Sequence, residues 1–200
     1  MRPAWVIMTV LAIYVAGIAI GGIVAPPSRS SFMAEVFARA PVATLFHFAG
    51  GAVAIIAGAF QVNRRFRERN RKRHRRLGAL YILGVVAGGV AALPLAAAST
   101  ADLVTRLGFG TLAVCWLATT LLAFRAIWRR DIPAHQRWMY RSYALTLAAV
   151  TLRIYMPLSQ VLGIQFEDAY RVVAWICWVT NLVIVESWFV PRVRAQTADA

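Results

Sequence analysis

Long apolar stretches alternate with short polar ones along this chain of 200 residues. A helix needs about 20 consecutive apolar residues to cross the hydrocarbon core of a bilayer. Six stretches meet this requirement: residues 5–25, 43–62, 79–98, 107–127, 142–162 and 170–190. The pattern therefore predicts an all-α fold, a polytopic integral membrane protein built as a bundle of six transmembrane helices. Because these spans use most of the chain, we expect residues 1–200 to form a single transmembrane domain.

The first apolar stretch follows Arg2, as the core of a secretory signal peptide would. It is longer than such a core, and cleavage after Ala25 would leave Pro26 and Pro27 at the new N-terminus, so we expect a retained anchor. The next segment, residues 26–41, predicts a short helix on the outer surface. Three serines can cap this helix, and four apolar residues form a stripe along it: Ser28, Ser30, Ser31, Phe32, Met33, Val36 and Phe37.

The net charge of +14 would suit a nucleic-acid-binding protein, but the distribution of the charge argues against one. Nine Lys or Arg residues fall between Arg64 and Arg76, and Phe66 is the one aromatic residue among them. Surfaces that bind single-stranded RNA interleave basic residues with aromatic ones that stack on bases. We therefore expect no nucleic acid partner.

Lys and Arg residues in short loops are retained on the cytoplasmic side of the inner membrane. With the N-terminus inside, seventeen basic residues fall in interior segments and four in exterior ones. The count predicts a multi-pass inner-membrane protein with both termini in the cytoplasm. Residues 63–78 then form a basic cytoplasmic loop, which should attract anionic lipid by roughly 1 kcal/mol per basic residue near the surface. Gly84 and Gly88 form a small-xxx-small pair, which indicates close helix packing or, alternatively, a homo-oligomer.

Ionisable residues inside membrane spans are costly and are therefore candidates for function. His47 and Arg153 lie at similar depth in the outer half of their predicted helices. We expect them to approach each other, either as a buried structural hydrogen bond or as a site for a small polar or anionic ligand. Gln61, at the inner end of its helix, and Asn181, at mid-membrane, complete the candidate ligand-binding residues.

A second polar group gathers at the inner face. Glu186 is the one acid inside a predicted span, and Arg137 or Arg141 is its expected partner in a structural ion pair. His74 and His135 both fall near this boundary. Two interpretations stay open: a salt-bridged collar that anchors the helix ends, or a cofactor site in which His74 and His135 ligate a haem b iron or another metal.

Several of these residues recur in a pattern that resembles a known family. The pattern comprises His47, Gly50, Gly51, Gln61, HRRLGALY at 74–81, AHQRWMYRSYALTLAAVTLR at 134–153, Asn181 and Glu186. It strongly resembles an uncharacterised family of predicted bacterial membrane proteins, domain of unknown function 2306, from about Ala43 to Trp188. The resemblance implies a membrane location and a compact polytopic domain, but no established activity.

The chain also resembles, more loosely, the small cytochromes b that carry haem between transmembrane histidines. Those proteins place paired histidines on facing helices at two depths, whereas this chain has three histidines in total. The resemblance therefore implies at most one haem, between His74 and His135.

Three classes of function stay open. The first is a redox or metal-binding membrane protein that uses the histidines, and the second is a transporter or binder of a small polar ligand. The third is a non-catalytic protein that binds anionic lipid or a partner through the basic segment. No nucleophile has a base and an orienting acid at compatible depth, so hydrolysis is not predicted.

Overall fold

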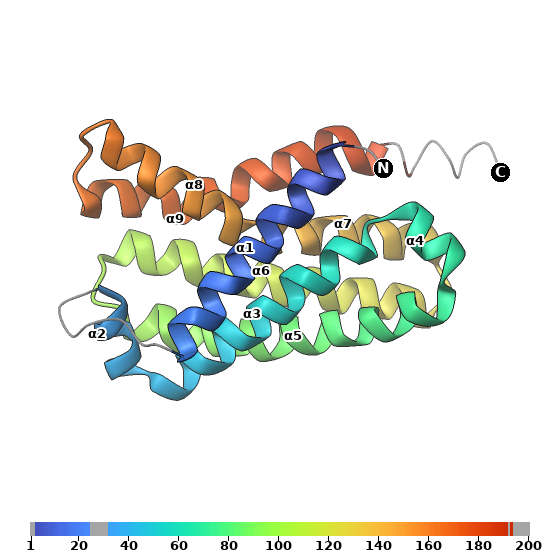
Figure 1. Ribbon diagram of the computed structural model, residues 1–200, viewed down its shortest axis with the longest axis horizontal. Coiled ribbons are helices and arrows are strands. Elements are labelled where there is room, and N and C mark those ends of the chain that lie inside the picture. Colours follow the sequence, from blue (N-terminus) through green and yellow to red (C-terminus); the bar gives the residue numbers. More distant parts are fainter. Residues whose placement is uncertain (1–2, 25–31, 192, 194–200) are drawn as a thin grey trace. The chain divides into compact units, whose positions relative to one another are not determined.

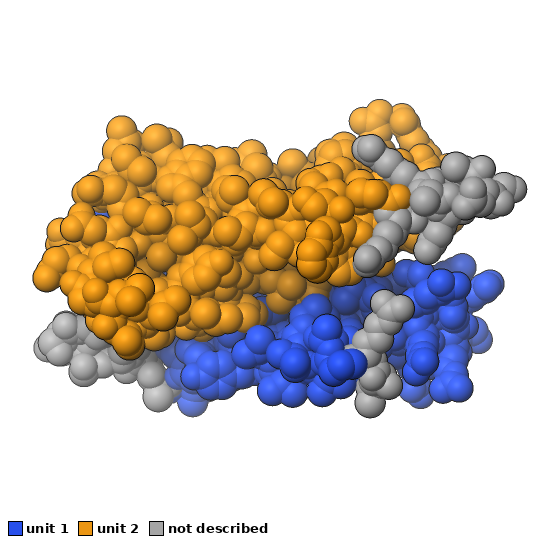
Figure 2. All heavy atoms as spheres, turned by 90° about the horizontal axis from the view of Figure 1, so that it is seen from above, with its two compact units in different colours: residues 1–101 blue, residues 102–200 orange. Residues whose placement is uncertain are grey.

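A computed structural model describes residues 3–24, 32–191 and 193. Within these residues every regular element is helical, and six helical segments are long and apolar enough to cross a membrane. The prediction of an all-α protein with six membrane spans is therefore confirmed. The chain divides into two compact units, Met1–Ala101 and Asp102–Ala200, which Figure 2 shows in different colours. The expectation of one domain stays a prediction.

The first unit contains three spans and two short helices (Figure 1). In chain order these are α1 (Pro3–Val24), α2 (Phe32–Arg39), α3 (Pro41–Gln61), α4 (Arg64–Arg69) and α5 (Arg71–Ala98). Helices α3 and α5 form an antiparallel hairpin, because Gln61 at the end of α3 contacts His74 at the start of α5, whereas His47 contacts Gly88 further along. Helix α1 packs against α3, where Trp5 Nε1 donates to the carbonyl oxygen of Ala59 at 2.8 Å.

The second unit contains the other three spans. Its elements are α6 (Leu103–Trp128), α7 (Ile132–Thr146), α8 (Ala148–Val161), α9 (Phe166–Ile184) and the π-helix η1 (Val185–Phe189). Helices α6 and α7 form an antiparallel hairpin held by side-chain hydrogen bonds between buried residues. Trp116 Nε1 donates to Thr146 Oγ1 at 2.9 Å, and the hydroxyls of Thr120 and Ser142 lie 2.6 Å apart. Such bonds suit a bilayer, where a polar group facing lipid would be unsatisfied.

Small residues line the buried seams and large apolar residues face outward. Many of the buried apolar residues are alanines, and large side chains such as Ile7, Val10 and Leu121 are exposed. Lipid tails are as apolar as these side chains, so helices associate where small residues let backbones approach closely. The exposed apolar surface is therefore the expected lipid-facing surface of a membrane protein.

Two segments differ from the sequence-based expectations. Residues 63–78, expected as a loop, are mostly helical. Asn63 caps α4, because its side chain accepts a hydrogen bond from Phe66 N at 3.1 Å. Arg and Lys, which dominate this segment, are also good helix formers. The fifth span begins at Ile132 instead of residue 142, because Asp131 caps α7 by accepting from Ala134 N at 2.9 Å. This span is interrupted at Leu147, where α7 ends and α8 begins.

The predicted short helix after the first span is present as α2. Phe37, on its expected apolar stripe, packs edge-on against Phe48 of α3 with ring centroids 5.7 Å apart. The expected serine caps, Ser28, Ser30 and Ser31, lie outside the described residues.

Candidate functional site

The close approach of α3 and α5 explains why Gly50 cannot be larger. A Cβ atom at Gly50 would lie 2.6 Å from the carbonyl oxygen of Gly84 and 2.6 Å from the amide nitrogen of Gly88. Gly84 and Gly88 therefore serve close packing inside the chain. At this seam His47 Nδ1 lies 2.9 Å from the carbonyl oxygen of Gly88. A carbonyl only accepts, so Nδ1 carries the hydrogen and Nε2 is the basic nitrogen of neutral His47.

Gln61 and His74 meet at the other end of the same seam. Gln61 is buried, and its Nε2 donates to the carbonyl oxygen of His74 at 2.9 Å. The Gln61 side chain also occupies the space beside Gly78, where a Cβ atom would lie 3.5 Å from Gln61 Oε1. The amide thus ties the end of α3 to the first turns of α5. This arrangement supports a structural role for Gln61, and the ligand-binding interpretation stays a prediction.

His135 occupies a position in α7 that corresponds to that of His74 in α5. Each is the fourth residue of its helix, and each backbone amide donates to the N-cap residue, Asn70 at 2.9 Å for His74 and Asp131 at 3.0 Å for His135. The ring of His135 places Nδ1 2.9 Å from the carbonyl oxygen of Ala123 on α6. His135 therefore carries its hydrogen on Nδ1, and Nε2 is the nitrogen that would ligate a metal.

The two sequence-predicted histidine pairings each involve both units. His74 and His47 belong to the first unit, whereas His135 and Arg153 belong to the second. The pairing of His74 with His135 around an iron, and that of His47 with Arg153, therefore stay predictions. Within the described residues, no group of three or more His, Cys, Asp or Glu residues could hold a metal ion.

Asn181 lies beside the interruption of the fifth span. Its Nδ2 donates to the carbonyl oxygen of Ala144, in the last turn of α7, at 3.1 Å, and lies 2.9 Å from Thr151 Oγ1 of α8. One side chain on α9 thus contacts both halves of the broken helix. Arg153, two residues after Thr151, donates from Nη1 to the carbonyl oxygen of Ala149 at 2.9 Å. Thr151 was not a sequence candidate, because a single threonine in an apolar span gives no signal of its own.

The second unit pairs Arg141 of α7 with Glu186 of η1. Arg141 Nε lies 2.5 Å from Glu186 Oε1, and Nη2 lies 3.0 Å from Oε2, so the contact is bidentate. The guanidinium also lies over the Trp138 ring, 4.5 Å from its centroid. Glu186 is carried by five residues of π-helix, a local widening that changes the direction of the side chains after it. Arg137, the other expected partner, is half-buried on α7.

The buried hydroxyl pair of α6 and α7 was also absent from the sequence candidates. Trp116 and Thr120 are four residues apart on α6, and Ser142 and Thr146 are four residues apart on α7. This spacing places each pair on one helix face. Polar residues repeated at this spacing within an apolar span were therefore a usable signal.

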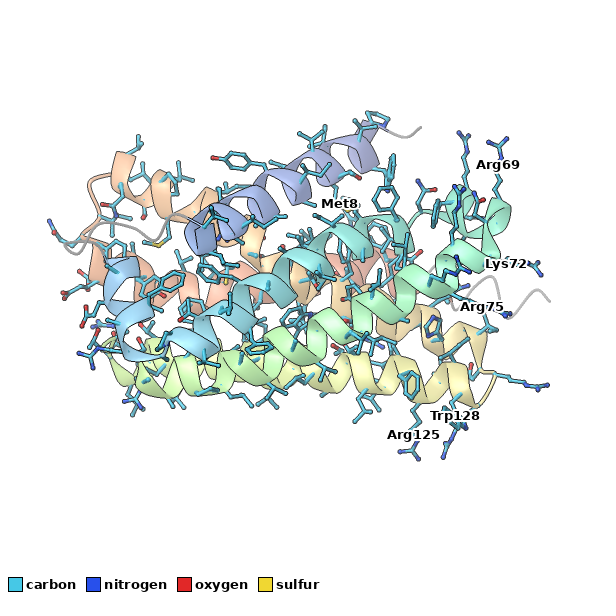
Figure 3. The ribbon with its side chains drawn as sticks, turned by 60° about the horizontal axis from the view of Figure 1, so that its bottom comes forward. Met8, Arg69, Lys72, Arg75, Arg125 and Trp128 are labelled. Carbon is cyan, nitrogen blue, oxygen red and sulfur yellow. The ribbon has the colours of Figure 1, made fainter. Side chains whose placement is uncertain are left out.

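Nine basic residues on α4 and the start of α5 form what we call the basic surface. It comprises Arg64, Arg65, Arg67, Arg69, Arg71, Lys72, Arg73, Arg75 and Arg76, of which all but Arg67 are exposed. Figure 3 shows Arg69, Lys72 and Arg75 extending away from the helices at this end of the first unit. The one acid among them, Glu68, accepts from Arg64 Nε at 2.6 Å, and this hydrogen bond, with the charges of Arg64 and Arg67, holds its pKa below the usual range.

Aromatic side chains fasten the basic surface to the spanning helices. Phe66 of α4 packs against Phe60 of α3 with ring centroids 5.7 Å apart, and Phe60 packs against Trp5 of α1 at 6.3 Å. Aromatic residues in membrane proteins are enriched at the level of the lipid headgroups. Helix α4 therefore has an aromatic side directed at the bundle and exposed arginines directed away from it.

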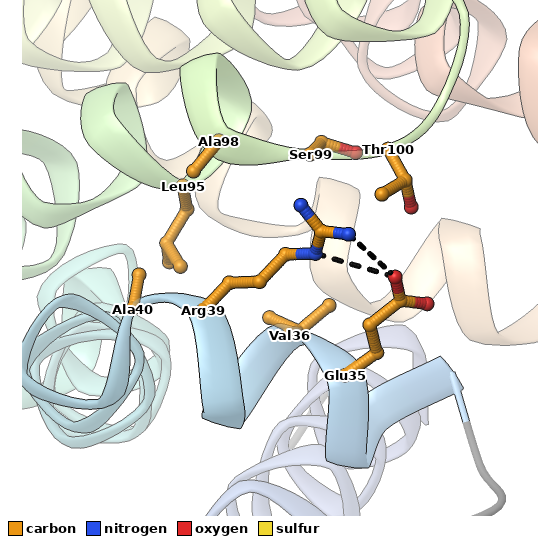
Figure 4. Close-up of a pocket in the computed structure, with 8 residues that line it drawn as sticks. All are labelled: Glu35, Val36, Arg39, Ala40, Leu95, Ala98, Ser99 and Thr100. Atoms are coloured by element: carbon orange, nitrogen blue, oxygen red, sulfur yellow. Dashed lines mark hydrogen bonds and ion pairs between the residues drawn. The ribbon is translucent and has the colours of Figure 1, made fainter.

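The opposite end of the first unit carries a hollow between α2 and the end of α5. Its lining residues are Glu35, Val36, Arg39, Ala40, Leu95, Ala98, Ser99 and Thr100. Arg39 Nη2 lies 3.0 Å from Glu35 Oε1 within the hollow, as Figure 4 shows. The side chains of this pair are half exposed to solvent. An exposed ion pair of this kind contributes little energy, and nothing in the hollow selects a ligand.

Comparison with known proteins supports a family but no activity. No curated protein and no solved structure matches the chain. The profile of a family described as predicted membrane protein (DUF2306) matches residues 44–189. This range covers most of the chain and includes both helical hairpins, the Asn181 contacts and the Arg141–Glu186 pair. The chain therefore belongs to the DUF2306 family of predicted membrane proteins.

Proposed function

We propose that this protein is a multi-pass inner-membrane protein, with both termini in the cytoplasm, that binds anionic phospholipid through its basic surface. The observation that carries the proposal is the density of exposed positive charge. Nine basic residues occupy residues 64–76, eight of them are exposed, and the one acid among them, Glu68, bonds to Arg64. Anionic headgroups in the adjacent leaflet attract such a surface.

The attachment of α4 to a spanning helix supports a lipid partner over a soluble one. Phe66 and Phe60 hold α4 against the end of a spanning helix, which keeps the arginines close to the headgroups. Basic residues near an anionic leaflet contribute about 1 kcal/mol each. This attraction falls off within a Debye length of about 8 Å at physiological salt, so proximity decides its strength.

The test measures the lipids that stay with the full-length protein in nanodiscs of mixed neutral and anionic lipid. We expect enrichment of the anionic lipid, and a loss of about tenfold or more when Arg69, Lys72 and Arg75 are replaced by Gln, because three attractive charges are removed. The matched control replaces Arg125, Arg129 and Arg130, which are exposed on the second unit, by Gln. An equal loss in both variants would assign the effect to net charge and contradict the proposal.

The Arg141–Glu186 pair supports a second, structural part of the proposal, a collar at the inner face. Its bidentate geometry and the stacking on Trp138 suit an anchor between α7 and η1. A structural anchor predicts that Glu186→Gln lowers the thermal stability of the protein in detergent while leaving its lipid binding unchanged. Loss of lipid binding at unchanged stability would contradict this role.

Haem b or metal binding is a second candidate function, and the orientation of His135, one of its two expected ligands, supports it. Histidines that ligate metals donate their other ring N–H to a carbonyl or carboxylate, as His135 does to Ala123. His47 donates to Gly88 in the same way. The test is the absorption spectrum and elemental content of the purified protein. The candidate predicts a Soret band that disappears in His74→Ala and His135→Ala and persists in His47→Ala. A colourless, metal-free protein contradicts it.

A further inference from the structure

The first two turns of α5 carry four exposed cations on one side of the helix. An α-helix turns by about 100° per residue, so Arg71, Lys72, Arg75 and Arg76 fall within a sector of about 140°. All four side chains are exposed. The residues of α5 that pack on α3, such as Gly84 and Gly88, lie on the other side of the helix. The sector is therefore directed away from the hairpin.

These four cations stand in two like-charged pairs. Arg71 and Arg75, and likewise Lys72 and Arg76, are four residues apart, which places their Cβ atoms about 5–6 Å from each other. Like charges at this spacing destabilise a helix, and cations in the first turn also oppose the positive end of the helix dipole. Among the described residues no ion pair involves any of the four. The described part of the chain therefore supplies no counter-charge to these four cations.

Phosphate is the group that fits each pair. Arginine presents a planar fork of donors that matches phosphate oxygens bidentately, and three of the four cations are arginines. A single phosphate can satisfy one pair. Because the two pairs share one helix face, two phosphates must lie side by side to satisfy both, and two separate lipids would repel each other there.

We propose that Arg71–Arg75 and Lys72–Arg76 form a site for one cardiolipin-type lipid, a phospholipid in which a glycerol joins two phosphates. This inference rests on the lipid binding proposed above. The location of the pairs at the end of two spanning helices makes a lipid of the surrounding bilayer the occupant. Linking two phosphates in one molecule makes binding of the second intramolecular, which strengthens binding without any new contact. The site therefore prefers this lipid over a singly charged one at equal total charge.

The experiment compares two anionic lipids on the full-length protein. Nanodiscs in a neutral background contain either cardiolipin or phosphatidylglycerol, with cardiolipin at half the molar fraction so that total charge matches. Native mass spectrometry counts the lipids that remain bound. We expect cardiolipin to be retained at least about tenfold more than phosphatidylglycerol. Equal retention per charge overturns the two-phosphate site and leaves the proposed function standing, whereas no enrichment of either lipid overturns both.

Two variants with equal loss of charge locate the site. In R71Q/K72Q/R75Q/R76Q both pairs of α5 are removed, and the preference for cardiolipin should disappear. In R64Q/R65Q/R67Q/R69Q the same number of charges is removed from α4, so total anionic lipid should fall while the preference remains. A folded α5 variant that keeps the preference overturns the assignment.

Hydrogen exchange of the unmodified protein provides a second measurement that needs no variant. Bound phosphates relieve the repulsion within the pairs, so cardiolipin should slow amide exchange at residues 71–76 more than phosphatidylglycerol does at equal charge. Equal slowing by the two lipids overturns the two-phosphate site even if the α5 variant fails to insert.

Discussion

A side chain at Gly50 would collide with the backbone of the neighbouring helix. Its Cβ atom would lie 2.6 Å from atoms of both Gly84 and Gly88, and backbone atoms can give way only if the two helices separate. We predict that Gly50→Ala destabilises the protein by about 1–3 kcal/mol, the usual cost of overpacking. The measurement is thermal unfolding in detergent.

The adjacent glycine is the matched control for this prediction. A Cβ atom at Gly51 has nothing within 4 Å, so Gly51→Ala adds the same methyl group in open space. Alanine is the better helix former by about 1 kcal/mol, and Gly51→Ala should be neutral or stabilising. Equal destabilisation by both substitutions would mean that helix contact is not what requires Gly50.

Asp102 links two helices of the second unit in a pH-dependent way. Its Oδ2 accepts from Arg171 Nε at 2.6 Å and its Oδ1 accepts from Thr105 N at 2.8 Å. The bond from Arg171, followed by that from Thr105, holds the pKa of Asp102 below its ordinary value. A carboxyl with a lowered folded-state pKa stabilises the protein above its unfolded-state pKa, and this contribution is lost as pH falls through the folded-state pKa.

The melting temperature should therefore fall when the pH drops below the ordinary range of aspartate. Asp102→Asn keeps an acceptor for Thr105 and loses the charge, so it should melt lower than the unmodified protein at neutral pH and equally in strong acid. Asp131→Asn is the control, because Asp131 caps α7 and has no ion pair within the described residues. A difference between Asp102→Asn and the unmodified protein that persists in strong acid would show that charge is not the cause.

At the residue scale, the sequence identified polar residues but few of their partners. Glu186 was expected to pair with Arg137 or Arg141 because an acid within a span needs a nearby cation, and the structure pairs it with Arg141. The carbonyl of Gly88 beside His47 could not be foreseen. Backbone acceptors carry no sequence signal, and their availability depends on which helices touch.

At the scale of elements, the interruption of the fifth span at Leu147 depends on a contact with another helix. The residues around it, YALTLAAV at 143–150, include no Gly or Pro, so nothing local requires a break. Asn181 supplies the missing interaction by bonding Ala144 on one side and Thr151 on the other. A local pattern cannot reveal a break that is stabilised by a distant residue.

Removing the Asn181 amide should loosen this break. We predict that Asn181→Leu destabilises the protein by about 1 kcal/mol, within the range measured for side-chain hydrogen bonds between membrane helices. Hydrogen exchange near Leu147 should become faster as well. Thr119→Val is the control, because Thr119 Oγ1 donates to the carbonyl oxygen of Cys115 within its own helix at 2.8 Å. If both variants unfold and exchange alike, Asn181 does not hold the break.

The boundaries of elements were harder to predict than their existence. The most apolar 18-residue stretch of the fifth span has a mean hydropathy of 1.2, the lowest of the six spans, and α7 begins with polar residues outside the apolar run. The apolar run in the sequence therefore predicts only the later part of this span. The start of α7 is instead marked by capping chemistry, Asp131 followed by Pro133, which apolar content does not report.

At the scale of the whole molecule, six spans could be predicted because each contains enough apolar residues to cross the bilayer by itself. The two compact units could not, since the choice of neighbours among apolar helices depends on small residues at close contacts. Gly50 and Gly84 show such a contact inside the first unit. Orientation is also a property of the whole molecule, because it follows from the distribution of Lys and Arg over all connecting segments.

The seventeen-to-four distribution of basic residues predicts that both termini are cytoplasmic. Of two reporters fused after Ala200, one that works only in the cytoplasm should be active, and one that works only in the periplasm should be inactive. Because orientation depends on the number of basic residues and not on their order, a scramble of residues 64–76 that keeps His74 and equal charge should insert normally. Replacing the nine basic residues by Gln should impair insertion or orientation, since the strongest cytoplasmic signal is lost. If the reporter that works only in the periplasm is active when it is fused to the unmodified protein, the charge distribution does not set the topology of this protein.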